Sequence, residues 1–123
     1  MRGVDFGAFR VNERTTAVFA ADLQDETGAA IPGDDLDALT LTLYDETTRQ
    51  VINSRDAVDV LNANGGTVDG QGHFVMVFSA DDNQHLGGDT TETHVALFRW
   101  TYDTDKQGSQ RVLLSVINEP KVP

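Results

Sequence analysis

The sequence contains no cysteine, which excludes disulfide bonds, thiolate metal sites and cysteine nucleophiles together. Basic residues are also scarce, nine against twenty acidic residues, so the formal net charge is −11. Such a chain is a poor partner for nucleic acid, whose phosphates attract lysine and arginine. No stretch approaches the roughly 18–20 apolar residues of a membrane-spanning helix. Residues 1–23 carry charged side chains where a signal peptide needs an apolar run. We therefore expect neither nucleic-acid nor membrane partners.

What the chain does contain is typical of one globular domain. It has 123 residues, of which 39% are apolar and 24% charged, and a chain of this size buries enough surface for one hydrophobic core. The acidic charge is concentrated in residues 22–92, which hold two arginines and fifteen acidic residues. This charge is typical of a solvated surface that keeps copies apart, and it would also complement a basic protein partner.

Alternation of apolar and polar residues predicts strands over residues 17–23 and 39–44. Asp69-Gly70 favours a tight hairpin turn between strands at 67–68 and 74–78. Longer strands are predicted at 93–102 and 110–117, and a short one at 50–53. Residues 56–61 are either a helical turn or irregular, and Ser79 is a suitable N-cap for a short helix over 80–86.

These elements predict an all-β fold, an immunoglobulin-like antiparallel β-sandwich of about seven strands with one or two short helical turns. Residues 1–14 show no regular period and are predicted to form an N-terminal arm. The sandwich domain is expected to cover residues 15–120, followed by a C-terminal tail at 121–123.

Three of the predicted strands are apolar on both faces: 74–78, 95–98 and 112–117. Either these are central strands whose second face is covered within the domain, or one sheet presents an apolar patch to another subunit. Tryptophan, tyrosine and arginine are the usual anchors of protein interfaces. The candidate interface residues are therefore Arg99, Trp100 and Tyr102, joined by Phe6 and Phe9 of the predicted arm.

The sequence offers no recognisable catalytic or cofactor motif. His73, His85 and His94 form no metal-ligand pair at helical spacing, so we interpret them as surface or structural histidines. Asp103-x-Asp105-x-x-Gly108 begins like a calcium loop, but it lacks the bidentate glutamate at the twelfth position. The pairs at 34–35 and 81–82 either occupy solvated turns or join a looser calcium site. We expect no enzyme activity, cofactor or metal.

Five segments carry a family resemblance: Thr40–Asp45, Val51–Asn53, Leu61–Gly65, Ser79–Asn83 and Glu92–Phe98. Through them, residues 15–120 resemble a group of small proteins encoded among the structural genes of tailed bacteriophages. The resemblance implies a virion component, an immunoglobulin-like β-sandwich module on the capsid, neck or tail.

The leading hypothesis is thus a non-enzymatic structural protein of a tailed-phage particle, a capsid decoration, neck or tail accessory subunit. It would be made in the host cytoplasm, reside in the virion and bind other virion structural proteins in many copies. An alternative is a carbohydrate- or cell-surface-binding module, with or without calcium, that uses Tyr44, Trp100 and Tyr102. A host-encoded adhesin or extracellular module is a third.

Overall fold

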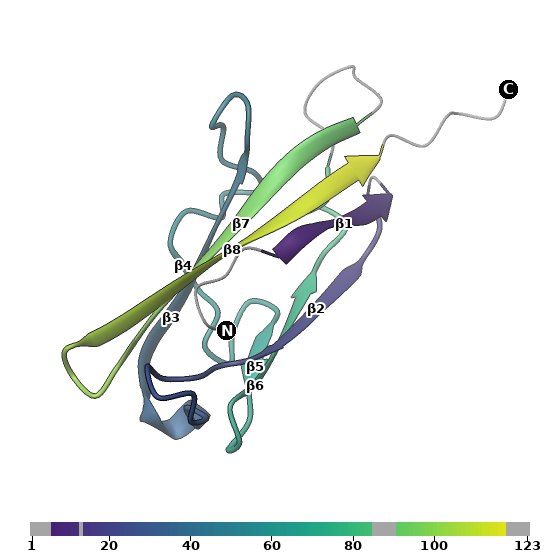
Figure 1. Ribbon diagram of the computed structural model, residues 1–123. Coiled ribbons are helices and arrows are strands. Elements are labelled where there is room, and N and C mark those ends of the chain that lie inside the picture. Colours follow the sequence, from purple (N-terminus) through teal and green to yellow (C-terminus); the bar gives the residue numbers. More distant parts are fainter. Residues whose placement is uncertain (1–5, 13, 85–90, 118–123) are drawn as a thin grey trace, which may run out of the picture.

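The computed structural model describes residues 6–12, 14–84 and 91–117, with only the backbone of residues 6–9, as two β-sheets (Figure 1). Within these residues the elements are β1 (Phe6–Asn12), β2 (Ala17–Asp22), the short 3₁₀ helix η1 (Gly33–Asp35), β3 (Leu36–Asp45), β4 (Val58–Asp59), β5 (Gly66–Val68), β6 (His73–Phe78), β7 (Thr91–Tyr102) and β8 (Lys106–Ile117). No helix in this described part is long and apolar enough to cross a membrane.

The larger sheet has the strand order β1-β8-β7-β3-β4, and the smaller sheet has the order β2-β6-β5. The described strand pairs are antiparallel except for β1 and β8, which run parallel, as Figure 1 shows. The predicted all-β sandwich is confirmed. Compared with the expected set, the described residues add the strands β1 and β4 and one parallel pair, and they lack the strand expected at 50–53.

The core forms where the alternating apolar residues of the two sheets face each other. Leu39, Leu41 and Leu43 of β3 are almost fully buried, because successive side chains of a strand point to opposite faces. Phe98 on β7 lies at the centre. Its ring stacks on Phe19 of β2 at 5.8 Å between centroids and meets the edge of Phe74 at 5.2 Å. Aromatic contacts thereby tie the smaller sheet to the larger one.

The strands with two apolar faces divide between the two interpretations. On the larger sheet the outward Val95 is fully buried, between its register partners Tyr44 and Leu113. On the smaller sheet, Val77 of β6 is 40% exposed and its partner Val18 of β2 is 63% exposed. The outward apolar residues are therefore buried or half-buried on the larger sheet, as at Val95 and Leu97, and exposed on the smaller one.

The predicted N-terminal arm contains a strand of the larger sheet. Arg10, Val11 and Asn12 pair in register with Ser115, Val116 and Ile117. Val11 is 5% exposed, so burial of this side chain accompanies the backbone pairing. The prediction of a separate arm over residues 1–14 is therefore wrong for residues 6–12. The predicted tail at 121–123 lies outside the described residues.

Three short elements differ from their predictions. Residues 50–53 contribute a single bridge, Tyr44 to Val51, rather than a strand. The 56–61 segment contains the two-residue strand β4. Residues 80–83 form turns instead of a continuing helix, and their backbone hydrogen bonds run from Asp82 N to Ser79 O and from Asn83 N to Ala80 O, three residues apart. The rest of the predicted helix lies outside the described residues.

Candidate functional site

The predicted interface residues on β7 lie on opposite faces of the larger sheet. Arg99 is exposed on the outer face, whereas Trp100 and Tyr102 are only 3% and 7% exposed. Strand alternation separates them, because neighbouring residues of a strand point in opposite directions. Trp100 and Tyr102 are thus wrong as exposed anchors. Phe6 and Phe9 pair through their backbone with Val112 and Leu114, and their side chains lie outside the described part.

Trp100 and Tyr102 have partners within the chain. The Trp100 indole lies over Gly108, where an added Cβ would come within 2.5 Å of the ring. The Tyr102 hydroxyl donates a 2.7 Å hydrogen bond to Glu26 Oε2, and Lys106 Nζ donates one of 2.7 Å to Oε1. The bond from Lys106, followed by that from Tyr102, lowers the pKa of Glu26 to about 2. These contacts attach the loop after β2 to the β7–β8 hairpin.

Arg99 borders an open hollow on the outer face of the larger sheet. The hollow has a volume of about 590 Å³, and residues of three strands line it: the polar Thr40, Arg99, Thr101, Gln107 and Ser109 together with Ala38, Trp100 and Gly108. It offers hydrogen-bond donors and acceptors to a ligand.

An uncovered apolar row crosses the outer face of the smaller sheet. Val18 on the edge strand β2 lies directly opposite Val77 of β6, and Ala20 lies opposite the half-buried Val75. The row ends at Asp22 and His73, whose Oδ1 and Nδ1 are 2.5 Å apart. The hydrogen bond that the protonated imidazole donates to Asp22, followed by the charges of Asp69 and Asp22, raises the pKa of His73.

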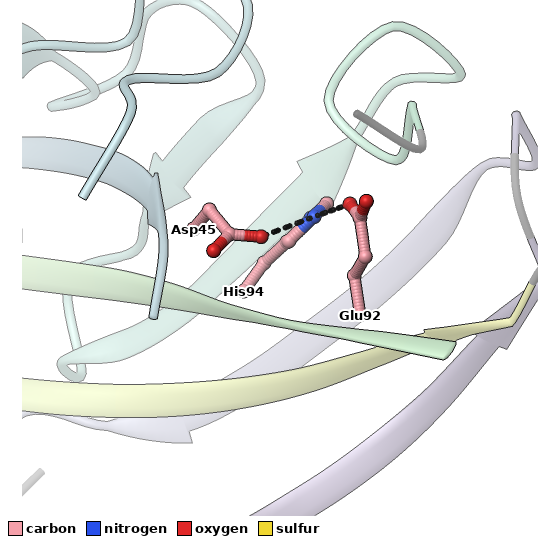
Figure 2. Close-up of side chains that lie close together, drawn as sticks. All are labelled: Asp45, Glu92 and His94. Carbon is pink, nitrogen blue, oxygen red and sulfur yellow. Dashed lines mark hydrogen bonds and ion pairs between the residues drawn. The ribbon is translucent and has the colours of Figure 1, made fainter. Parts of the chain in front are cut away.

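A second cluster is buried on the inner face of the larger sheet, where β3 and β7 lie side by side, and contains Asp45, Glu92 and His94. Figure 2 shows the His94 imidazole between the two carboxylates. Its Nε2 lies 2.9 Å from Glu92 Oε1 and 3.9 Å from Asp45 Oδ2. The side chains of His94, Asp45 and Glu92 are only 1%, 8% and 9% exposed. One ligand atom from each residue lies within 4.8 Å of the others, so the three could hold one metal ion.

Strand register brings this cluster together. Asp45 ends β3 directly opposite His94 of β7, and Glu92 precedes His94 by two residues, on the same face of the strand. The backbone amides of Thr47 and Thr48 each donate a 2.9 Å hydrogen bond to Asp45 Oδ1. These bonds orient the carboxyl group so that its other oxygen, Oδ2, faces His94.

Only one of the two nitrogens of the His94 imidazole has a hydrogen-bond partner among the described residues. His94 Nδ1 is buried and has no hydrogen-bond partner among the described residues. With a neutral imidazole the cluster of Asp45, Glu92 and His94 carries two negative charges, and with a protonated one it carries one. An imidazole nitrogen and two carboxylates are ligand types that metal cations bind in proteins.

Asp82 forms a different buried contact, with Arg55. Arg55 Nε and Nη2 donate hydrogen bonds of 2.9 Å to the two Asp82 oxygens. Asn53 Nδ2 and the Ser79 amide donate two more, each 2.8 Å long. Burial alone would raise the pKa of Asp82, but these bonds outweigh it and hold the pKa below its usual 3.8. We call this contact the Arg55–Asp82 clamp.

The clamp and the buried cluster show which of the predicted histidines and acidic pairs lie in a candidate metal site. Asp82 is occupied by Arg55 and is not available to calcium. Asp45, Glu92 and His94 form the one candidate metal group found among the described residues, and neither predicted acidic pair contributes to it. The usable signal was Glu92-x-His94, because a spacing of two places both side chains on one face of a strand. The pair Glu92 and His94 is not found at the three- or four-residue spacing of a helix.

Comparison of the chain with known protein families, curated proteins and solved structures finds no match to any of them.

Proposed function

We propose that this chain is a non-enzymatic structural module that acts through protein–protein contacts, as a subunit of a tailed-phage particle. It would decorate the capsid or serve as a neck or tail accessory subunit, present in many copies and bound to other virion proteins. The sequence resemblance to small virion proteins is the reason for proposing that the chain is part of a phage particle. The apolar row on the smaller sheet supports the mode of action.

That row is the observation that carries the proposal. The exposed large hydrophobic residues among the described positions are Val18, Val51 and Val77, and two of these three are direct cross-strand partners. An apolar surface that continues over adjacent strands favours contact with another protein. Because β2 is also an edge strand of its sheet, its backbone can pair with a strand of a neighbouring subunit.

The strand order supports the immunoglobulin-like part of the proposal. In that fold the first, second, fifth and fourth strands of the domain form one sheet, and the third, sixth and seventh form the other. If β1 and β4 are set apart as strands of the larger sheet, β2-β6-β5 and β8-β7-β3 match this arrangement except for its first strand. The contact of Phe19 on β2 with Phe98 on β7 then joins the two strands that a disulfide joins in antibody domains.

The test has two parts. Mass spectrometry of purified tailed particles from the strain that encodes the chain should detect it in stoichiometric copies. Light scattering should then detect assembly of the purified protein, alone or with the isolated particle proteins. Val18→Lys combined with Val77→Lys should abolish this assembly without unfolding the domain, because lysines are poorly tolerated in an apolar interface.

The matched control is Thr40→Lys, an outward position on the larger sheet, which should assemble like the unmodified chain. Particles that lack the chain would overturn the virion role. Assembly that survives the double lysine variant would overturn the apolar row as its contact surface.

The hollow beside Arg99 favours one alternative, a carbohydrate-binding module. Its polar lining provides groups that hydrogen-bond sugar hydroxyls. A glycan array probed with the monomeric protein tests this alternative. Binding that Arg99→Ala abolishes, by a chain absent from particles, would favour it over the virion role.

A further inference from the structure

We infer that Asp45, Glu92 and His94 form a binding site for a divalent transition-metal ion, with zinc as the expected occupant. The inference is independent of the assembly role, since the cluster lies between strands of one chain.

The distances fit a single ion. A tetrahedral zinc ion with bonds of about 2.0–2.2 Å holds its ligand atoms roughly 3.4 Å apart. His94 Nε2 is 2.9 Å from Glu92 Oε1 and 3.9 Å from Asp45 Oδ2, so the two separations lie on either side of that value. All three ligand atoms lie within 4.8 Å of one another, so side-chain adjustments would bring them to bonding distance of one ion.

The charge also fits. Two carboxylates and a neutral imidazole carry two negative charges, which one divalent cation balances. In a site this inaccessible to water, the attraction between these charges and a cation is stronger than it would be at the surface.

The donor set selects the kind of metal. Calcium and magnesium take oxygen ligands almost exclusively, whereas an imidazole nitrogen together with carboxylates suits zinc and other first-row transition metals. The orientation of Asp45 by the Thr47 and Thr48 amides is the kind of secondary support that metal-ligating carboxylates have in proteins.

The consequence for the fold is a cross-link. Asp45 ends β3, and Glu92 and His94 lie near the start of β7. An ion bound by all three would fasten these two strands at one end of the larger sheet. Since the side chains are almost inaccessible, the metal would serve structure rather than turnover.

The experiment titrates metal-free protein with zinc, and in parallel with calcium, by isothermal titration calorimetry. Cobalt(II) is then added as a spectroscopic probe, because its visible absorption reports coordination geometry. We expect one zinc per chain, no calcium binding, and a raised melting temperature with zinc. His94→Gln should weaken zinc binding by more than about 100-fold, since even the loss of a supporting residue typically costs 10–100-fold.

The matched control is His73→Gln, which alters the exposed histidine–carboxylate pair and should leave the zinc affinity unchanged. If His94→Gln does not fold, Glu92→Gln replaces it, and the ¹⁵N shift of His94 Nε2 in the unmodified protein reports metal contact directly. The inference is overturned if the unmodified chain binds no stoichiometric zinc. Zinc binding that persists unchanged in the folded variant, or an Nε2 shift that does not respond to zinc, would also overturn it.

Discussion

Among the residues that the structure describes, carboxylates are buried at two places, and the two places differ in the cation that faces them. Asp82 is held by Arg55, a permanent cation that donates to both carboxylate oxygens. Asp45 and Glu92 face His94, which is positive only when protonated. The Arg55–Asp82 clamp is complete within the chain, with four hydrogen bonds to one carboxylate.

The comparison shows how the same residue type serves two purposes. A carboxylate with a full set of donors and a fixed counter-charge fastens two loops and has little capacity for a further ligand. Asp45 and Glu92 instead face an imidazole that can itself be a metal ligand, and one atom from each of the three residues could bind the same ion. The following predictions test that distinction, from the largest expected effect to the smallest.

Asp82→Asn should cause the largest loss of stability. The substitution leaves the Arg55 guanidinium, whose side chain is only 11% exposed, without its counter-charge. Removing one partner of a buried ion pair typically costs about 3–5 kcal/mol of the free energy of unfolding. Urea denaturation measures this loss.

The control is the adjacent Asp81→Asn. Asp81 is 72% exposed and lies 3.9 Å from an exposed Arg14, so its loss should cost less than about 1 kcal/mol. Equal losses in the two variants would show that the clamp is no more important than a surface ion pair.

Asp45→Asn should cost only about 1 kcal/mol in metal-free protein, because an amide oxygen still accepts the Thr47 and Thr48 hydrogen bonds. Zinc should widen this difference. At a zinc concentration 100 times the dissociation constant, the unmodified chain gains about 2.7 kcal/mol that the variant lacks. Urea denaturation with zinc and with a chelator measures both values, and the same difference under both conditions would contradict the comparison.

Acid should weaken the clamp. The pKa of Asp82 is lower in the folded protein than its usual value, so its contribution is complete above about pH 4 and is lost as the pH falls through the folded pKa. The stability difference between the unmodified chain and Asp82→Asn should therefore shrink below pH 4. Urea denaturation from pH 6 to pH 2.5 measures it, and a constant difference would refute the assignment.

The exposed Asp22–His73 pair should give the smallest effect on stability. The Asp22 hydrogen bond raises the pKa of His73, so its contribution is complete below about pH 6.5 and is lost as the pH rises through the folded pKa. Asp22→Asn should move that pKa back toward 6.5. An NMR titration of the His73 ring measures the change, and an unchanged pKa would mean that Asp22 does not cause the shift.

Periodicity made much of the fold predictable from the sequence. Leu39, Leu41 and Leu43 alternate with polar residues, and Asp69-Gly70 marks a hairpin, so β3 and the β5–β6 pair were expected. Strand β1 was not, because Phe6–Asn12 has no strict alternation and its partner β8 lies at the far end of the chain. Local patterns carry no information about such a distant pairing.

The candidate site was less predictable than the fold. Glu92 and His94 could have been paired from their spacing on a strand, but Asp45 joins them only through the β3–β7 register. Similarly, the burial of Trp100 depends on which face of β7 lies inward, and its contact with Gly108 depends on the β7–β8 register. Registers follow from the packing of the whole domain and cannot be read from one segment.

The parallel pairing of β1 with β8 has a consequence for synthesis on the ribosome. All strands of the smaller sheet precede residue 79, so they can pair while the rest of the chain is still being made, at about 5–20 residues per second. The larger sheet cannot close until β8 has emerged and β1 has docked beside it. Strand β1 thus leaves the ribosome before the other described strands but can pair only after β8, the last of them, has emerged.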